Sequence, residues 1–219
     1  MRNIKIVGFG NSITEAVIGV PDENKKWLNI LRNKLSDTFS SYIFTVVNSG
    51  KGGDSAREAM ARFAKDVLSH EPDFVILEFG GNNEDLAHPE RIVKKDEFRT
   101  LLEKYKNELP QGTRTIVVTF PPVLDDLHSY GKMPEFADYY QKAGGIDKTV
   151  EPYREITRKF ANENTLPLYD FHDELKSLGE LNGKELYTLD DGVHLSEEGN
   201  KVLADGIFRI LGKILTKEK

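Results

Sequence analysis

Cysteine is absent from the 219-residue sequence, so the fold relies on neither disulfide bonds nor thiolate metal sites. No run of apolar residues is long enough to span a bilayer. Clustered basic residues are also missing: 30 lysine and arginine residues are outnumbered by 36 aspartate and glutamate residues, for a net charge of -6. Because phosphate binding needs clustered cations, we expect neither nucleic acid nor a membrane as a partner.

The amino terminus also lacks the pattern of an export signal. The letters MRNIKIV lead directly into an apolar stretch, with no basic region, short apolar core or cleavage site before it. Together with the absence of cysteine, this predicts a cytoplasmic protein. The length and an apolar content of 38% predict one domain over residues 1–219. No pattern in the sequence indicates an oligomeric state.

Predicted strands and helices alternate along the chain, which indicates the α/β class with a parallel sheet covered on both faces. Short apolar runs predict five strands, at residues 4–9, 42–47, 73–79, 115–120 and 166–171. Apolar residues at helical spacing predict helices at residues 24–39, 56–67, 96–109 (with Asp96 as the N-cap) and 150–162, and from Ser196 onward. Trp27 is expected in the core rather than in a pocket.

An insertion at about residues 122–146 interrupts this alternation. It mixes His128, Tyr130, Phe136 and Tyr140 with glycine and proline, after the carboxyl end of a predicted strand. Such a segment either shapes a ligand pocket or packs on the surface without a function. We expect it to shape a pocket.

The first strand is followed directly by Gly10, Asn11 and Ser12. In an open parallel α/β sheet, ligands bind at the carboxyl ends of the strands. A serine there is a candidate nucleophile if other segments supply a base and donors for an oxyanion. The alternative is that Ser12 is only a turn residue or a helix cap, as most serines after buried strands are.

A candidate base lies near the carboxyl terminus, where Asp191 precedes His194 by three positions. In a tight turn the carboxylate reaches Nδ1 of the imidazole, and Nε2 is left to face a serine. The alternative is that both are ordinary residues of a turn before a helix. A rival base, His172, also follows a predicted strand, but its position is more typical of a helix start.

Three groups are candidate oxyanion donors: the backbone amides of Ser12 and Gly53 and the side-chain amide of Asn82. Gly53 lies in a glycine-rich loop after the second strand, where the backbone can approach a substrate closely. Taken singly, Gly53 could only permit a turn and Asn82 could only cap a backbone group. Their joint placement after successive strands favours a shared site.

These segments resemble the SGNH, or GDSL-type, hydrolase superfamily. The matching segments, in the family's order, are Gly10-Asn11-Ser12-Ile13-Thr14, residues 48–55, Gly80-Gly81-Asn82-Asn83 and Asp191-Gly192-Val193-His194. The resemblance implies a three-layer α/β/α sandwich with strand order 2-1-3-4-5. It also implies that Ser12 is the nucleophile, that His194 with Asp191 is the base, and that Ser12, Gly53 and Asn82 form the oxyanion hole.

The resemblance further implies a hydrolase for small-molecule carboxylic esters, such as short acyl esters or O-acetylated sugars, without a metal or organic cofactor. A lysophospholipase or thioesterase of the same fold is the alternative. The sequence departs from the family at Asn11, which is usually aspartate, and at Asn83, which is often aspartate. Both are near-isosteric changes that keep supporting turn hydrogen bonds. We hypothesise that losing two nearby negative charges makes His194 a slightly weaker base.

Other classes of function remain as alternatives. A flavodoxin-like protein would bind phosphate at the loop after the first strand, but Ile13 occupies the place of the third glycine of the GxGxxG spacing. A binding module that kept the site but lost turnover is a second alternative, and it would explain why asparagine replaces aspartate at Asn11 and Asn83. Metal-dependent hydrolysis is not indicated, since the remaining histidines show no ligand spacing: His70, His88, His128 and His172.

Overall fold

A sheet of five parallel strands lies at the centre of the computed structural model, which describes residues 1–217. The strands are β1 (Arg2–Gly10), β2 (Tyr42–Gly50), β3 (Phe74–Glu78), β4 (Arg114–Val118) and β5 (Leu168–Tyr169). Their order in the sheet is β2-β1-β3-β4-β5, and every neighbouring pair is parallel. The predicted order 2-1-3-4-5 is therefore confirmed.

Helices connect the strands and cover both faces of the sheet. The α-helices are α1 (Ser12–Glu15), α2 (Trp27–Thr38), α3 (Ala56–Met60), α4 (Phe63–Asp66), α5 (Lys95–Glu108), α6 (Pro134–Ala143), α7 (Ile146–Glu163), α8 (Phe171–Asn182) and α9 (Glu197–Thr216). Short 3₁₀-helices are η1 (Glu23–Lys25), η2 (Leu68–His70), η3 (Gly81–Glu84), η4 (Pro89–Arg91), η5 (Ser129–Lys132) and η6 (Lys184–Leu186). Among residues 1–217, none of the helices has the length and apolar character needed to cross a bilayer.

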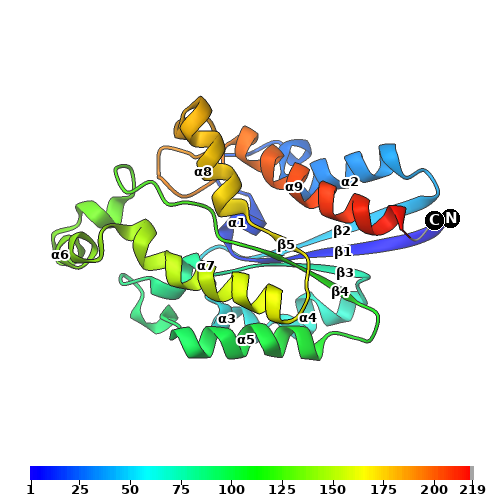
Figure 1. The fold of residues 1–219 in the computed structure, drawn as a ribbon, viewed down its shortest axis with the longest axis horizontal. Helices are drawn as coiled ribbons and strands as arrows, with labels where there is room; N and C mark the ends of the chain where they lie inside the picture. Colours follow the sequence, from blue (N-terminus) through cyan, green and yellow to red (C-terminus); the bar gives the residue numbers. More distant parts are fainter. Residues whose placement is uncertain (218–219) are drawn as a thin grey trace.

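Figure 1 shows α2, α8 and α9 on one face of the sheet and α3, α4, α5 and α7 on the other. Side chains of β1 alternate between the two apolar layers, as expected for a strand buried on both faces. Ile4 and Ile6 pack with residues of α2 and α9, whereas Val7 and Phe9 pack with residues of α4, α5 and α7. The molecule is the three-layer α/β/α sandwich that the sequence predicted.

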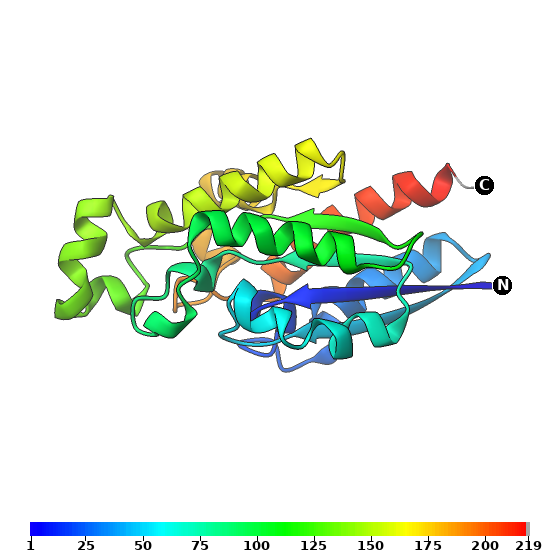
Figure 2. The same cartoon turned by 90° about the horizontal axis from the view of Figure 1, so that it is seen from below.

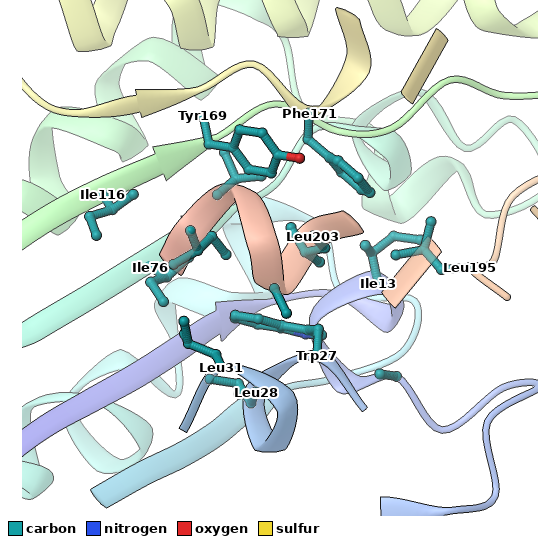
Figure 3. Close-up of a cluster of buried hydrophobic side chains, with 14 of the residues drawn as sticks. Ile13, Trp27, Leu28, Leu31, Ile76, Ile116, Tyr169, Phe171, Leu195 and Leu203 are labelled. Atoms are coloured by element: carbon teal, nitrogen blue, oxygen red, sulfur yellow. The ribbon is translucent and has the colours of Figure 1, made fainter. Parts of the chain in front are cut away.

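Trp27 lies in the first of these layers, beside Leu28 and Leu31 of α2 and near Leu203 of α9 (Figure 3). Its side chain is 1% exposed, and its Nε1 donates a hydrogen bond to the carbonyl oxygen of Thr14 at 3.0 Å. Trp27 is therefore a core residue, as expected, and it connects α2 to the segment after β1.

The helix predicted over residues 56–67 is interrupted between α3 and α4 by Arg62. The guanidinium of Arg62 donates hydrogen bonds to the carbonyls of Gly10 (2.9 Å) and Ser49 (2.7 Å) and to the carboxylate of Asp54 (2.6 Å). Arg62 thus joins the carboxyl ends of β1 and β2, which accounts for a break that helical periodicity does not reveal.

Several predicted boundaries also differ from the structure. β2 continues to Gly50 because its last residues pair with the end of β1, whereas the edge strand β5 is reduced to two paired residues. The prediction of Asp96 as an N-cap is wrong: Lys94 holds that position, and Asp96 lies in the first turn of α5. There its negative charge favours the helix through the helix dipole. α7 begins at Ile146, earlier than the predicted residue 150.

The segment at residues 122–146 forms η5 and α6 and projects beyond the carboxyl ends of the strands (Figures 1 and 2). Its start is held by Arg154 of α7, whose side chain is fully buried. Arg154 donates to the carbonyls of Phe120 (2.9 Å) and Pro121 (2.7 Å) and to Asp147 (2.6 Å). Asp147 in turn accepts from the amide of Val123 at 2.8 Å. α7 therefore fixes the path of the chain as it leaves β4.

Candidate active site

Ser12 is the first residue of α1, which follows β1 after the single residue Asn11. The side chain of Asn11 caps this helix, since its Oδ1 accepts from the amide of Ile13 at 2.9 Å. Ser12 therefore stands at the amino-terminal end of a short helix at the carboxyl edge of the sheet, where the sequence placed it.

His194 lies in the loop that precedes α9. The loop is closed by a hydrogen bond from the amide of Leu189 to the carbonyl of His194 at 2.8 Å. The imidazole Nε2 is 3.0 Å from Ser12 Oγ, and Nδ1 is 2.6 Å from Asp191 Oδ2. Ser12, His194 and Asp191 thus form one continuous chain of hydrogen bonds, with a geometry that permits proton transfer from hydroxyl to imidazole.

Hydrogen bonds to the other carboxylate oxygen hold Asp191 in place. Asp191 Oδ1 accepts from the amides of Val193 and His194, both at 2.9 Å. Partial burial opposes ionisation, but these bonds and the bond from the imidazole outweigh it and lower the pKa of Asp191 below its ordinary value. The ionised carboxylate accepts from Nδ1, which leaves Nε2 as the acceptor for the serine hydroxyl.

The candidate oxyanion donors line the same cavity as Ser12 and His194. Within residues 1–217 the amides of Ser12 and Gly53 donate no hydrogen bond to the protein. Asn82 of η3 donates one Nδ2 hydrogen to the carbonyl of Asp54 at 3.1 Å, and a primary amide keeps a second hydrogen. Three donors are thus free to face a developing negative charge beside the serine.

Gly53 adopts a positive φ of 79°. This conformation strains any residue with a Cβ, and a Cβ there would also lie 3.0 Å from Nη1 of Arg91. A glycine at this position therefore adopts this backbone conformation without strain and leaves room for the arginine.

The cavity has a volume of about 390 Å³ and a lining of mixed chemistry. The apolar side chains of this lining are Ile18, Phe120, Val123, Tyr140, Ile146, Val150 and Val193. Its charged side chains include Glu84, Asp85 and Arg91. The segment at residues 122–146 contributes His128 and Tyr130 as well, and the amide of Leu124 donates to the carbonyl of Gly192 at 2.8 Å.

Arg91 was not among the predicted site residues. Its Nη1 is 3.4 Å from Asp85 Oδ2, and its Nε is buried without a hydrogen-bond acceptor in the described chain. The nearest carboxylate to Nε is that of Glu58, at 3.9 Å. The guanidinium therefore keeps donor capacity beside the oxyanion donors. No sequence signal marks it, because the polar stretch before α5 has no periodicity.

The two residues that depart from the family pattern are both fully buried. Asn11 Nδ2 donates to Glu78 Oε1 at 3.3 Å, and Asn83 Oδ1 accepts from the amide of Ala56 at 3.1 Å. Neither side chain is hydrogen-bonded to His194. Their contacts indicate a structural role in the loops, so an effect on the basicity of His194 stays a hypothesis.

His172 is the second residue of α8 and does not line the cavity that contains Ser12. It lines a separate surface hollow, where its Nδ1 is 2.8 Å from Asp173 Oδ1. Asp170, His172 and Asp173 are close enough together to share a metal ion. However, Arg158 already contacts Asp170 at 2.6 Å and Asp173 at 3.2 Å, so a cation of the protein neutralises this cluster.

Comparisons with known proteins identify the family and the fold of the chain. The family described as GDSL-like Lipase/Acylhydrolase matches residues 6–207. The chain is 28% identical over 175 residues to the uncharacterized lipoprotein YqeF of Bacillus subtilis, covering 75% of this chain and 69% of that protein. It is 27% identical over 171 residues to an acetylxylan esterase of Geobacillus stearothermophilus, covering 76% and 72%.

A solved structure of a lipase/acylhydrolase from Enterococcus faecalis superimposes with a TM-score of 0.76. The match covers 96% of this chain and 95% of that one, at 23% sequence identity. At this level of identity the superposition establishes a common fold.

Proposed function

Since the chain belongs to the GDSL-like lipase/acylhydrolase family and is a carboxylic ester hydrolase, we propose that it cleaves small polar acyl esters through an acyl-enzyme on Ser12. The observation that carries the proposal is the 3.0 Å contact between Ser12 Oγ and His194 Nε2, which continues at 2.6 Å from His194 Nδ1 to Asp191. A serine with a base and an orienting carboxylate is the arrangement that acyl transfer requires.

The reaction proceeds in two halves. His194 takes the proton of Ser12 as its Oγ attacks the ester carbonyl, and the amides of Ser12 and Gly53 with the side chain of Asn82 stabilise the tetrahedral oxyanion. The imidazolium then gives its proton to the alcohol as the carbon–oxygen bond breaks. A water molecule, deprotonated by His194, hydrolyses the acyl-enzyme by the same steps and restores Ser12.

We infer that the substrates are short acyl esters of polar alcohols, such as O-acetylated sugars. A cavity of about 390 Å³ suits a small ligand better than a long acyl chain. The apolar side chains of the lining, such as Phe120, suit the acyl group or one face of a sugar ring. Arg91 and Asp85 supply donors and acceptors for hydroxyl groups. The similarity to an acetylxylan esterase supports the same choice.

The central assignment is tested with Ser12→Ala and a fluorophosphonate probe. We expect the purified wild-type protein to hydrolyse p-nitrophenyl acetate and to be labelled at Ser12, whereas Ser12→Ala does neither. Thr45→Ala, an exposed change on β2 that does not line the cavity, is the control for general damage. Hydrolysis by Ser12→Ala at the wild-type rate would falsify the acyl-enzyme on Ser12.

Substrate preference is tested with p-nitrophenyl esters of rising chain length beside acetylated xylosides. We expect kcat/KM to be highest for acetyl esters and to fall as the acyl chain grows. A maximum for long acyl chains, lysophospholipids or acyl thioesters would instead favour the lysophospholipase or thioesterase alternative. Arg91→Met should lower kcat/KM for the xylosides by about tenfold or more, with a smaller change for p-nitrophenyl acetate, which offers no hydroxyl groups.

A further inference from the structure

Glu78 is the last residue of β3 and is 2% exposed. A buried carboxylate costs free energy unless hydrogen bonds compensate for its lost hydration. Its Oε2 accepts from the hydroxyl of Thr14 at 3.0 Å, and its Oε1 accepts from the side-chain Nδ2 of Asn11 at 3.3 Å. Burial raises the pKa of Glu78 to about 7, although both of these hydrogen bonds lower it.

The two partners of Glu78 lie on either side of Ser12 in the sequence. α1 spans only four residues, so it cannot hold its own orientation. Side-chain contacts do so instead: Asn11 caps α1 through the amide of Ile13, and the carbonyl of Thr14 accepts from Trp27. The carboxylate of Glu78 joins both ends of the turn that carries Ser12.

The backbone packs tightly at the same place. Gly10 is the register partner of Glu78 in the β1–β3 pair. A Cβ on Gly10 would lie 2.1 Å from Thr14 Oγ1 and 2.5 Å from the carbonyl oxygen of Glu78. Only glycine allows α1 to approach the end of β3 this closely, which encloses the hydroxyl of Thr14 against the carboxylate.

We propose that Glu78 is a positioning residue for the nucleophile: by accepting hydrogen bonds from Asn11 and Thr14, its carboxylate fixes the turn that aims Ser12 Oγ at His194. This inference rests on the proposed role of Ser12. Glu78 acts through the turn: its side-chain hydrogen bonds go to Asn11 and Thr14, and none of these three residues lines the cavity. Its loss should therefore lower kcat and leave KM nearly unchanged.

The test compares Glu78→Ala, which removes the acceptor, with Glu78→Gln, which keeps one acceptor oxygen at the same place. We expect Glu78→Ala to lower kcat and the rate of fluorophosphonate labelling of Ser12 by about 10–100-fold, because small misplacement of a reacting group has effects of this size. Glu78→Gln should retain kcat within about threefold of the wild-type protein. KM should stay within about twofold in both.

Val75→Ala provides the matched control. Val75 lies on the same strand, is fully buried and packs in the other apolar layer, away from α1. Its truncation should lower stability without changing kcat or the labelling rate. An equal loss of kcat in Val75→Ala and Glu78→Ala would show general damage and overturn the proposal.

Thr14→Val gives a second test, which can be carried out even if Glu78→Ala folds poorly. This substitution removes only the hydroxyl group of Thr14 at a buried site. We expect Thr14→Val to lower the labelling rate in the wild-type background by more than threefold, and to have no further effect beyond twofold in the Glu78→Ala background, where the acceptor is already gone. Fully additive effects, or none in any background, would overturn the positioning role.

Failure of this inference is distinguishable from failure of the proposed function. If Ser12→Ala retains turnover, the proposed function is wrong. If Ser12→Ala is inactive while folded Glu78→Ala and Thr14→Val label at the wild-type rate, only the positioning role is wrong.

Discussion

His194 Nε2 lies 3.0 Å from Ser12 Oγ, although the two residues are 182 positions apart in the chain. Trp27 links the segments that carry them. Its Nε1 donates to the carbonyl of Thr14 in α1, and its backbone amide donates to Oδ1 of Asn200 in α9, at 3.2 Å. The nucleophile and the base are therefore held through one buried side chain and its backbone.

The first prediction concerns Asp191, which accepts a hydrogen bond from His194 Nδ1 at 2.6 Å. In Asp191→Asn the amide can donate to Nδ1, which favours the tautomer with the proton on Nε2 and prevents that atom from accepting the serine proton. By analogy with serine proteases, kcat should fall by about 10⁴-fold. Kinetics with p-nitrophenyl acetate measure the effect.

Asp190→Asn is the control for this change, because Asp190 is exposed and does not line the cavity. We expect its kcat to stay within about twofold of the wild-type value. If Asp191→Asn retained more than a tenth of wild-type kcat while folded, Asp191 would not be the residue that orients the base.

The second prediction concerns Asn82. Loss of one oxyanion donor typically costs about 10²–10³ in kcat, because the interaction is made chiefly in the transition state. Asn82→Ala should therefore lower kcat on this scale and change KM little. Asn82→Asp, which keeps the size but cannot donate, should behave similarly. A loss below tenfold in both variants, with an unchanged melting temperature, would exclude Asn82 as a donor.

Much of the fold could be predicted because it depends on patterns that are local in sequence. Apolar runs identified the strands, and apolar spacing identified α2, α5 and α9. The resemblance in four short segments supplied the strand order, which the structure confirms. The break at Arg62 could not be predicted, since it depends on hydrogen bonds to Gly10 and Ser49, which are distant in sequence.

The site was predictable only in part, for a similar reason. Ser12, Gly53, Asn82 and His194 occur in recognisable segments, and the structure brings them to one cavity. Arg91 reaches the cavity from a stretch with no pattern. Glu78 did give a signal, since a charged residue at the end of an otherwise apolar buried strand calls for a partner, but only the structure reveals Asn11 and Thr14 as its partners.

The third prediction concerns the stability of the cavity wall. Arg154 is fully buried and joins Asp147 to the carbonyls after β4. In Arg154→Leu the largely buried carboxylate of Asp147 loses its cation. The carbonyls of Phe120 and Pro121 also lose their hydrogen-bond donor. Removing one partner of a buried pair costs about 3–5 kcal/mol, and the free energy of unfolding in urea should fall by this amount.

Arg209→Leu is the matched control, because Arg209 pairs with Glu174 at the exposed surface. Exposed ion pairs contribute at most about 1 kcal/mol, so this variant should unfold close to the wild-type protein. Equal effects of the two substitutions would contradict the structural role of Arg154.

The last prediction concerns the pH dependence of stability through Glu78. Its pKa is raised from 4.5 to about 7 by burial. Below pH 4.5 the carboxyl is protonated in the folded and unfolded states alike. As pH rises toward 7 the unfolded chain ionises first, so the folded state binds more protons and the free energy of unfolding falls. Above pH 7 both states are ionised and this contribution becomes constant.

Glutamine does not titrate, so the free energy of unfolding of Glu78→Gln should not show this decrease between pH 4.5 and 7. Its free energy of unfolding, relative to the wild-type protein, should increase by roughly 3 kcal/mol between pH 4.5 and pH 8. Urea unfolding at several pH values measures the difference, with the exposed Glu198→Gln as the control that should show little change. A difference that is the same at both pH values would mean that Glu78 ionises equally readily in the folded and unfolded chains, and that its burial carries no electrostatic cost.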